Sequence, residues 1–506
     1  MNLAAILMAS AARLGGRTAL KLDGVELSYR ALDAASARVA ALLRRRGVEP
    51  GDRVGVMLPN VPEFAVVYYG ILRAGAVVVP VNVLLKEREV ARFLGDSGAG
   101  LLFGWHAFAE VVEVGARGAG TDCLFVTPGE FEWLLGSVRP ERDLCERDPS
   151  DTAVILYTSG TTGTPKGAEL THANLSRNAE AVRALHSLSE HDVTLGALPL
   201  FHSFGQTCAL NATIGAGGCL SLMERFEAGK ALEVIERDGV TVLQAVPTMY
   251  AALLSHPARD ARDHSTLRVC VSGGAPMPAE VMRGFERAFG RRVVEGYGLS
   301  ETSPLASSNH FGRHRKPGSI GAPIAGVEMK VVDADGNDLP CGEVGEIVIR
   351  GHNVMKGYWR RPEETAAVMR GGWFHTGDLG RADADGYFYV VDRSSDVINR
   401  GGYNVYPREV EEVLCEHPGV REAAVVGIPH PVLGEEVAAA VVPRVPAEGG
   451  LDLAALREFV KARVAAYKYP RQLWLVEELP RGPTGKVHKR EIVVPLEAAS
   501  TRRGPA

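Results

Sequence analysis

The chain has 506 residues, a formal net charge of -5 and 46% hydrophobic residues. One hydrophobic core rarely organises more than roughly 250–300 residues, so we expect two or more domains. Lysine and arginine are dispersed along the chain, which argues against a nucleic-acid-binding or membrane-surface protein. Its seven cysteines are scattered without a C-x-x-C pair, which excludes a disulfide framework or zinc cluster and fits a reducing cytoplasm.

The two most apolar stretches do not predict a signal peptide or a membrane span. Met1–Met8 lacks a basic leader and a cleavage site, so we expect an amphipathic first helix there. The longest apolar region, Phe64–Leu85, contains Arg73, Gly75 and Pro80. These residues divide it into a helix followed by a valine-rich strand. We therefore expect a cytoplasmic protein without integral membrane association.

The elements expected in the first half of the chain alternate between helix and strand, the pattern of a layered α/β domain. A helix is expected over 29–46, and strands over 53–58, 76–81, 153–157, 194–198, 241–245, 268–272 and 292–294. Residues 318–389 contain short β-like segments with Asp-Gly and Cys-Gly turns, which predict a compact, mainly β subdomain.

A separate small α+β unit is expected after residue 392. It would have helices near 407–416 and 453–464 and strands at 423–428 and 437–442. The tail, 498–506, is small and polar, and we expect it to be disordered.

The strongest functional signal is the segment Tyr157–Gly167, which consists largely of hydroxyl residues and glycines with one lysine. Glycines let backbone N–H groups approach an oxyanion, hydroxyls donate hydrogen bonds, and Lys166 adds a positive charge. The segment follows an apolar strand, and α/β proteins bind ligands at strand ends. Pro165 before the lysine and Gly167 after it differ from a Walker P-loop. The segment therefore predicts a phosphate-binding loop of another kind.

Four further segments carry chemistry of the same type. Gly296–Thr302 follows a strand and offers an aromatic ring and the carboxylate of Glu301, an oxygen ligand suited to Mg²⁺. Ser272–Pro276 leaves bare backbone for a flat group, although alone it indicates only a turn. Gly372–Leu379 places Asp378 after a glycine, where a carboxylate accepts ribose hydroxyls. Gly482–Arg490 carries a lysine on a loop with local geometry restricted by proline and glycine.

These five motifs, taken in their order along the chain and covering most of it, resemble the adenylate-forming superfamily of acyl-CoA synthetases, peptide-synthetase adenylation domains and luciferases. Fatty-acyl and aryl acyl-CoA ligases are the nearest likeness. The resemblance implies an α/β fold with a large N-terminal domain of layered α/β subdomains plus a β-rich subdomain. It also implies a small mobile α+β C-terminal domain. The expected bounds are 1–392 for the first domain, 393–396 for the hinge and 397–497 for the second domain.

The resemblance also implies the ATP, metal and catalytic residues. Those for ATP or AMP are Thr158, Ser159, Gly160, Thr161, Thr162, Gly163, Lys166, Gly274, Ala275, Pro276, Glu295, Gly296, Tyr297, Thr302, Asp378, Arg393 and Lys486. Glu301 and Thr158 would hold Mg²⁺. The catalytic residues would be Lys486, Glu301, Thr158 and His202.

In this superfamily the small domain rotates after adenylation, so that the lysine withdraws and a glycine loop reaches the coenzyme A channel. The implied coenzyme A residues are Gly401, Gly402 and Tyr403, and the implied pivot is Ser394-Ser395. The commoner residue at this pivot is Lys or Asp. The Ser-Ser pair therefore bears on the second half-reaction, the transfer of the acyl group to coenzyme A. The implied acyl contacts are His202, Phe204, Gln206, Thr248, Met249 and Ser303.

The sequence thus predicts an AMP-forming ligase that joins a carboxylic acid to coenzyme A, using ATP and Mg²⁺. A medium- or long-chain fatty acid is the first expectation for the acid, and an aryl or cinnamic acid is the second. The alternative is an adenylating enzyme whose acceptor is a carrier protein or an amine, or one that activates nitrite for N–N bond formation. A non-catalytic module is disfavoured because the charged motif residues are all retained. The state expected is a monomer or homodimer.

Overall fold

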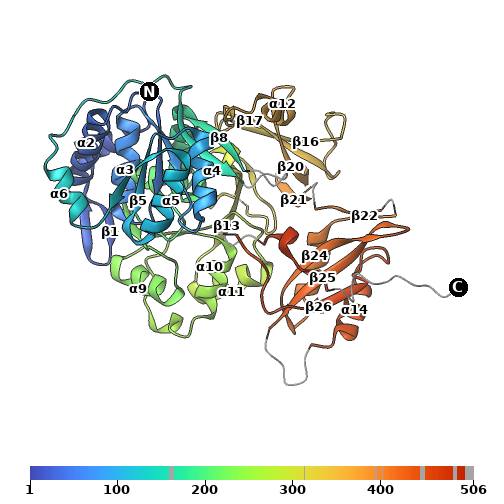
Figure 1. Cartoon of the computed structure of the whole chain (residues 1–506). Coiled ribbons are helices and arrows are strands. Elements are labelled where there is room, and N and C mark those ends of the chain that lie inside the picture. The colour runs from blue at the N-terminus through green and yellow to red at the C-terminus, as the bar shows by residue number, and fades with distance from the viewer. Residues whose placement is uncertain are drawn as a thin grey trace. The chain divides into compact units, whose positions relative to one another are not determined.

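The computed structural model describes residues 1–158, 165–312, 314–393, 396–401, 403–444, 451–482 and 487–495 (Figure 1). The chain divides into two compact units. Unit 1 comprises 1–329 and 349–374, and unit 2 comprises 330–348 and 375–506. The predicted hinge at 393–396 lies within unit 2, and the boundary predicted at residue 392 stays a prediction.

The first sheet of unit 1 has seven strands in the order β18-β8-β7-β4-β3-β5-β6. Its strands are β3 (Arg53–Met57), β4 (Val77–Pro80), β5 (Leu101–Trp105), β6 (Asp122–Val126), β7 (Thr152–Thr158), β8 (Lys166–Thr171) and β18 (Gly357–Tyr358). From β7 to β6 neighbouring strands are parallel, while β8 is antiparallel to both β7 and β18. The last segment of unit 1 thereby adds a strand beside the predicted phosphate loop.

The second sheet of unit 1 has nine strands in the order β15-β14-β13-β12-β11-β9-β10-β1-β2. Its strands are β1 (Thr18–Leu22), β2 (Val25–Ser28), β9 (Val193–Gly196), β10 (Cys219–Leu222), β11 (Val242–Ala245), β12 (Val269–Ser272), β13 (Val293–Gly298), β14 (Leu305–Ser308) and β15 (Ala322–Pro323). One core lies on a single face of this sheet, where Leu195, Leu243 and Cys270 pack with Leu232, Tyr250 and Phe285 of the helices that follow β10, β11 and β12.

The α-helices of unit 1 are α1 (Ala5–Leu14), α2 (Tyr29–Arg45), α3 (Pro62–Arg73), α4 (Glu87–Ser97), α5 (Ala109–Ala119), α6 (Glu130–Gly136), α7 (His172–Leu185), α8 (Ala212–Ala216), α9 (Ala228–Asp238), α10 (Pro247–Ser255), α11 (Ala279–Phe289) and α12 (Pro362–Val368). Local capping interactions determine where several of these helices begin. Ser28 caps α2 by accepting the N–H of Ala31, and Pro62 begins α3. None of the helices in the described part of the chain is long and apolar enough to cross a membrane.

Three strands, β16 (Val327–Val332), β17 (Gly345–Gly351) and β20 (Trp373–Ala382), continue from one unit into the other. With β19 (Met369–Arg370) they form a sheet of order β16-β17-β20-β19, and β21 (Phe388–Arg393) pairs with β20. The remainder of unit 2 is a sheet of order β23-β22-β25-β24 with β26 on β25. Its elements are β22 (Ile398–Arg400), β23 (Tyr403–Val405), β24 (Val420–His430), β25 (Gly434–Pro443) and β26 (Gln472–Leu475), with α13 (Pro407–Cys415) and α14 (Leu453–Lys461).

The α/β fold class predicted from the sequence is confirmed, and most predicted elements occur within a few residues of their expected bounds. Two functional segments differ. The strand expected at 292–294 continues as β13 to Gly298, and the segment that carries Asp378 is part of the long strand β20. In both cases an antiparallel partner, β14 or β21, supplies backbone hydrogen bonds that extend the strand through glycines.

Candidate active site

The predicted phosphate loop joins two strands of an antiparallel hairpin. Thr158 ends β7, Lys166 begins β8, and the two are register partners. The hydroxyl of Thr158 lies 3.5 Å from the carbonyl oxygen of Lys166. Ser159, Gly160, Thr161, Thr162 and Gly163 lie outside the described residues, so their contacts stay a prediction.

Gly167 has a different role from the one predicted. The sequence grouped it with the glycines of the phosphate-binding loop, but Gly167 is a strand residue of β8. A Cβ atom added there would lie 2.6 Å from Cγ2 of Ile155 on β7. Glycine is therefore required because the two strands pack closely at the base of the loop.

Tyr358 connects two of the predicted residues and was not identified from the sequence. Its hydroxyl donates a hydrogen bond to Oε1 of Glu301 at 2.9 Å, and Nζ of Lys166 lies 5.3 Å from the centre of its ring. Burial, and then the neighbouring Glu301 carboxylate, raise the pKa of the Tyr358 hydroxyl, so it stays protonated as a donor. The side chain therefore holds a carboxylate with its hydroxyl and a cation with its ring face.

The segment around β13 supplies several buried polar groups. Glu295 is 7% exposed, and its Oε2 accepts the N–H of Gly318 at 3.2 Å. Gly296 and Tyr297 follow it in the strand and pair with β14. Thr302 ends the short 3₁₀ turn η4 (Ser300–Thr302), where its hydroxyl accepts the N–H of Leu299 at 2.8 Å.

The turn that contains the predicted nucleotide-binding residues Gly274, Ala275 and Pro276 lies at the end of the neighbouring strand. Ser272 of β12 is the register partner of Glu295, so Gly274, Ala275 and Pro276 follow β12 beside β13. Gly274 has φ +79°, a conformation that side chains with a Cβ rarely adopt. Gly274 and Pro276 are exposed and Ala275 is half-buried, which leaves this turn accessible to a ligand.

The segment predicted to line the acyl entrance is positioned by Asn60, which follows β3. The Asn60 amide donates to the carbonyl oxygens of Gly196 and Leu198 at 3.0 and 2.8 Å and accepts the N–H of Leu200 at 2.9 Å. The chain then enters η2 (Phe204–Asn211), a π-helix. Such helices are rare and occur frequently at functional sites.

The predicted acyl contacts differ in exposure. The ring of His202 accepts the N–H of Phe204 at Nδ1 (3.3 Å), and burial lowers the pKa of His202 to about 4, so the imidazole is neutral at pH 7. Gln206 is fully buried. Thr248 is exposed at the start of α10. Met249 packs against the core that lies on one face of the nine-stranded sheet.

Ser303 is the remaining predicted acyl contact. It has φ +70°, in the left-handed region. Its hydroxyl donates to the carbonyl oxygen of Asn353 at 2.8 Å. Non-glycine residues held in this conformation cluster at functional sites because the surrounding structure must stabilise them.

Unit 2 contains the other predicted residues. Asp378 and Arg393 are register partners on β20 and β21, and the Nε of Arg393 lies 3.0 Å from Oδ1 of Asp378. The carboxylate of Asp378 is buried. Gly401 has φ +59° in the hairpin between β22 and β23, and the exposed ring of Tyr403 stacks on that of Tyr467 at 4.9 Å. Gly402, Ser394, Ser395 and Lys486 lie outside the described residues.

The described residues fit a magnesium ion only if the substrate supplies most of its ligands. Within the described part of the chain, no group of three or more His, Cys, Asp or Glu side chains is placed to hold a metal. Glu301, 9% exposed, offers one oriented carboxylate. Mg²⁺ is often held by one or two carboxylates together with substrate phosphates and water, which is the donor set that Glu301 beside a bound triphosphate would complete.

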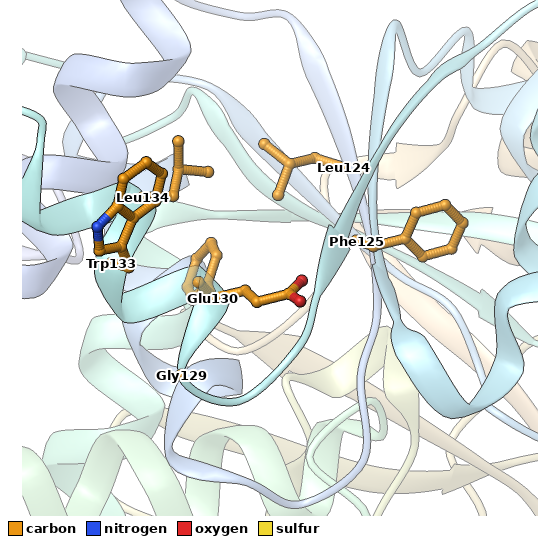
Figure 2. A pocket seen from close by; sticks show the side chains of 7 residues that line it. Leu124, Phe125, Gly129, Glu130, Trp133 and Leu134 are labelled. Atoms are coloured by element: carbon orange, nitrogen blue, oxygen red, sulfur yellow. The ribbon is translucent and has the colours of Figure 1, made fainter.

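A surface pocket of about 450 Å³ on unit 1 contains none of the predicted residues. It is lined by Leu124, Phe125, Gly129, Glu130, Phe131, Trp133 and Leu134, from β6 and α6. Figure 2 shows Trp133 and Leu134 on one side and Leu124 on the other, with the Phe125 ring on the far side of the strand. It lies at the sheet edge opposite β18, so it is separate from the residues gathered around Tyr358.

Two family models match the chain. The model described as AMP-binding enzyme matches residues 7–359, and the model described as AMP-binding enzyme C-terminal domain matches residues 409–486. A feruloyl-CoA synthase from Amycolatopsis sp is 41% identical, over 94% of this chain and 95% of that protein. A long-chain-fatty-acid–CoA ligase from Bacillus subtilis (strain 168) is 36% identical, over 97% of this chain and 94% of that protein.

Solved structures agree with these matches. The crystal structure of ATP-bound MatB from Rhodopseudomonas palustris superimposes with a TM-score of 0.90 at 34% identity. The superposition covers 97% of this chain and 98% of that one. The similarity thus extends over both units and includes a protein crystallised with ATP.

Proposed function

Given that the chain belongs to the AMP-binding enzyme family, among its AMP-forming acid–CoA ligases, we propose that it activates a fatty or aryl acid with ATP and transfers the acyl group to coenzyme A. Medium- and long-chain fatty acids and cinnamic-type acids are the two substrate classes proposed. The curated names of the relatives, a long-chain fatty-acid ligase and a feruloyl-CoA synthase, support both classes. The observation that carries the proposal is the Lys166–Tyr358–Glu301 arrangement at the base of the glycine-rich loop.

The roles proposed for the nucleotide site follow from charge. Lys166 and the loop from Thr158 to Gly163 would bind the β- and γ-phosphates, and Glu301 would hold the magnesium ion that offsets phosphate charge. Asp378 with Arg393 would hold the ribose hydroxyls, and Lys486 would contact the acid carboxylate and the α-phosphate. The ion pair between the buried Asp378 carboxylate and the partly exposed Arg393 supports the ribose role because it fixes the carboxylate in one orientation.

The proposed reaction has two steps. A carboxylate oxygen of the acid attacks the α-phosphorus in line, the bond to pyrophosphate breaks, and an acyl-adenylate forms. The thiolate of coenzyme A then attacks the acyl carbon, and AMP leaves. Positive charge from Lys486 offsets the repulsion between the two anions in the first step. Gly401, Gly402 and Tyr403 would guide the pantetheine in the second.

The test is AMP and pyrophosphate release across fatty, aryl and small acids and nitrite, each with and without coenzyme A, a carrier protein or an amine. Turnover that requires one carboxylic acid and coenzyme A is the expected result. Turnover without coenzyme A, in the presence of an amine or with nitrite, would contradict the proposed acceptor. Lys486→Ala should lose pyrophosphate exchange while folding normally, and exchange at the wild-type rate would contradict the role given to that lysine.

A further inference from the structure

A group of buried polar side chains lies on and near η2, which contains the predicted acyl contacts Phe204 and Gln206. Gln206 and Thr207 are on η2, Ser203 precedes it, and Gln244 is on β11; all are at most 1% exposed. Within the residues that the structure describes, five of their side-chain atoms have no hydrogen-bond partner: Ser203 Oγ, Gln206 Oε1, Thr207 Oγ1, and both Oε1 and Nε2 of Gln244. Such atoms are uncommon in folded proteins, and each calls for a physical explanation.

Strand register places Gln244 on the same face of the sheet as the helical segment that contains η2. Thr194 of β9 points to this face, because its hydroxyl lies 2.7 Å from that of Thr213 on α8, the helix that continues from η2. Val242 is the register partner of Thr194, and Gln244 lies two residues further along β11. Leu243, between them, packs into the core on the opposite face. Since side chains alternate along a strand, Gln244 faces the side that carries α8 and η2.

The same segment contains the predicted acyl contacts His202, Phe204 and Gln206. A Cβ atom added at Gly273, directly after β12, would lie 3.1 Å from the Phe204 ring. β11 and β12 are neighbouring strands, and the N–H of Gly273 donates a hydrogen bond to the carbonyl oxygen of Ala245 at 3.3 Å. The start of η2 therefore lies beside the C-terminal ends of β11 and β12. The predicted acyl contacts and the additional buried polar residues belong to this one region.

The free-energy cost of burying these unpaired polar groups indicates their function. A buried polar group without a partner costs about 1–3 kcal/mol, whereas apolar residues of similar shape would be nearly neutral. An enzyme that bound only an unsubstituted hydrocarbon chain would gain nothing from four such side chains. Neither η2 nor β11 contains a lysine, arginine or histidine to neutralise a second anionic group. These two elements therefore supply no counter-charge for a carboxylate or sulfonate on the tail.

We propose that Gln206, Thr207 and Gln244 form the specificity-determining end of the acyl site and bind a neutral hydroxyl group on the tail of the acid. This inference rests on the proposed ligase function and narrows its substrate class. A hydroxyl both donates and accepts, so it can donate to the Oε1 atom of one glutamine and accept from Nε2 of Gln244. Unsubstituted acids of the same skeleton leave these groups unpaired, and the enzyme discriminates against them.

The experiment compares acids that differ by one hydroxyl. Values of kcat/KM for coenzyme A-dependent AMP release are measured for cinnamic and 4-hydroxycinnamic acid, and for hexadecanoic and 16-hydroxyhexadecanoic acid. In the skeleton that the enzyme prefers, the hydroxylated acid should be favoured by at least about 10-fold. Gln244→Met, which keeps the size and removes the amide, should reduce this ratio to near one while raising the activity with the unsubstituted acid.

The matched control is Gln472→Met on β26 in unit 2, where Oε1 is likewise buried without a partner among the described residues. This variant should keep the wild-type ratio. An equal or higher kcat/KM for the unsubstituted acid, or an unchanged ratio in Gln244→Met that is folded by circular dichroism, would overturn the inference and leave the ligase function intact. Absence of coenzyme A-dependent turnover with every acid tested would instead contradict the proposed function itself.

Discussion

Removing the hydroxyl of Tyr358 tests the central geometry of the candidate site. In Tyr358→Phe the ring remains beside Lys166, but the 2.9 Å hydrogen bond to Oε1 of Glu301 is lost. Both side chains are only 9% exposed, so water replaces the lost donor poorly. A hydrogen bond to a charged group contributes about 1.5–3 kcal/mol, and we expect a destabilisation in that range.

The functional effect should depend on the Mg²⁺ concentration, which separates it from the effect on folding. Groups that orient a metal-binding carboxylate typically change metal affinity or activity about 10–100-fold when they are removed. We therefore expect Tyr358→Phe to lower the rate of pyrophosphate exchange at low Mg²⁺ concentration by on the order of 10-fold, with partial recovery as Mg²⁺ increases. The assay is exchange of labelled pyrophosphate into ATP over a Mg²⁺ titration, with urea unfolding in parallel.

The control is Tyr29→Phe, which removes a buried hydroxyl that donates to the carbonyl oxygen of Gly218 at 2.7 Å. It should lose stability without changing the Mg²⁺ dependence of exchange. If both variants respond to Mg²⁺ as the wild type does, the reasoning about Tyr358 and Glu301 is wrong.

Three further predictions follow from burial and packing. Burial lowers the pKa of His186 to about 3 against about 6.5 in the unfolded chain. The unfolded state therefore binds more protons, and the free energy of unfolding should fall as pH drops from about 6.5 towards about 4. Urea unfolding at several pH values should show a shallower decline in His186→Met, and an identical decline would contradict this. In Gly298→Ala the new Cβ would lie 1.7 Å from the carbonyl oxygen of Pro304, so we expect a loss of more than about 3 kcal/mol. Gly16→Ala, which meets nothing within 4 Å, should unfold like the wild type in the same urea titration. Asp378→Asn should raise the KM for ATP and abolish the preference for ATP over 2′,3′-dideoxy-ATP, whereas a retained preference would exclude a ribose contact.

Much of the fold could be predicted from the sequence because strand and helix formation here depend on local patterns. The apolar run at 153–157 and the valines at 77–79 form strands of the same sheet, and the helix expected at 29–46 occurs at Tyr29–Arg45. Glycine-rich segments were harder to assign. Gly296 and Gly298 lie in β13 because β14 pairs with them, and that partner is not adjacent to them until the chain has folded back.

The candidate site, like the fold, could be predicted from the sequence only in part. The sequence by itself predicted the loop, Lys166, Glu301 and Asp378 as candidate site residues, because phosphate, metal and ribose binding need those residue types. Tertiary structure alone decided that Tyr358, 57 positions after Glu301, joins Glu301 and Lys166, and that Gln244 shares a face with η2. Sheet order and register determine these contacts, and both result from the packing of segments distant in the chain. Local sequence preferences do not contain that information.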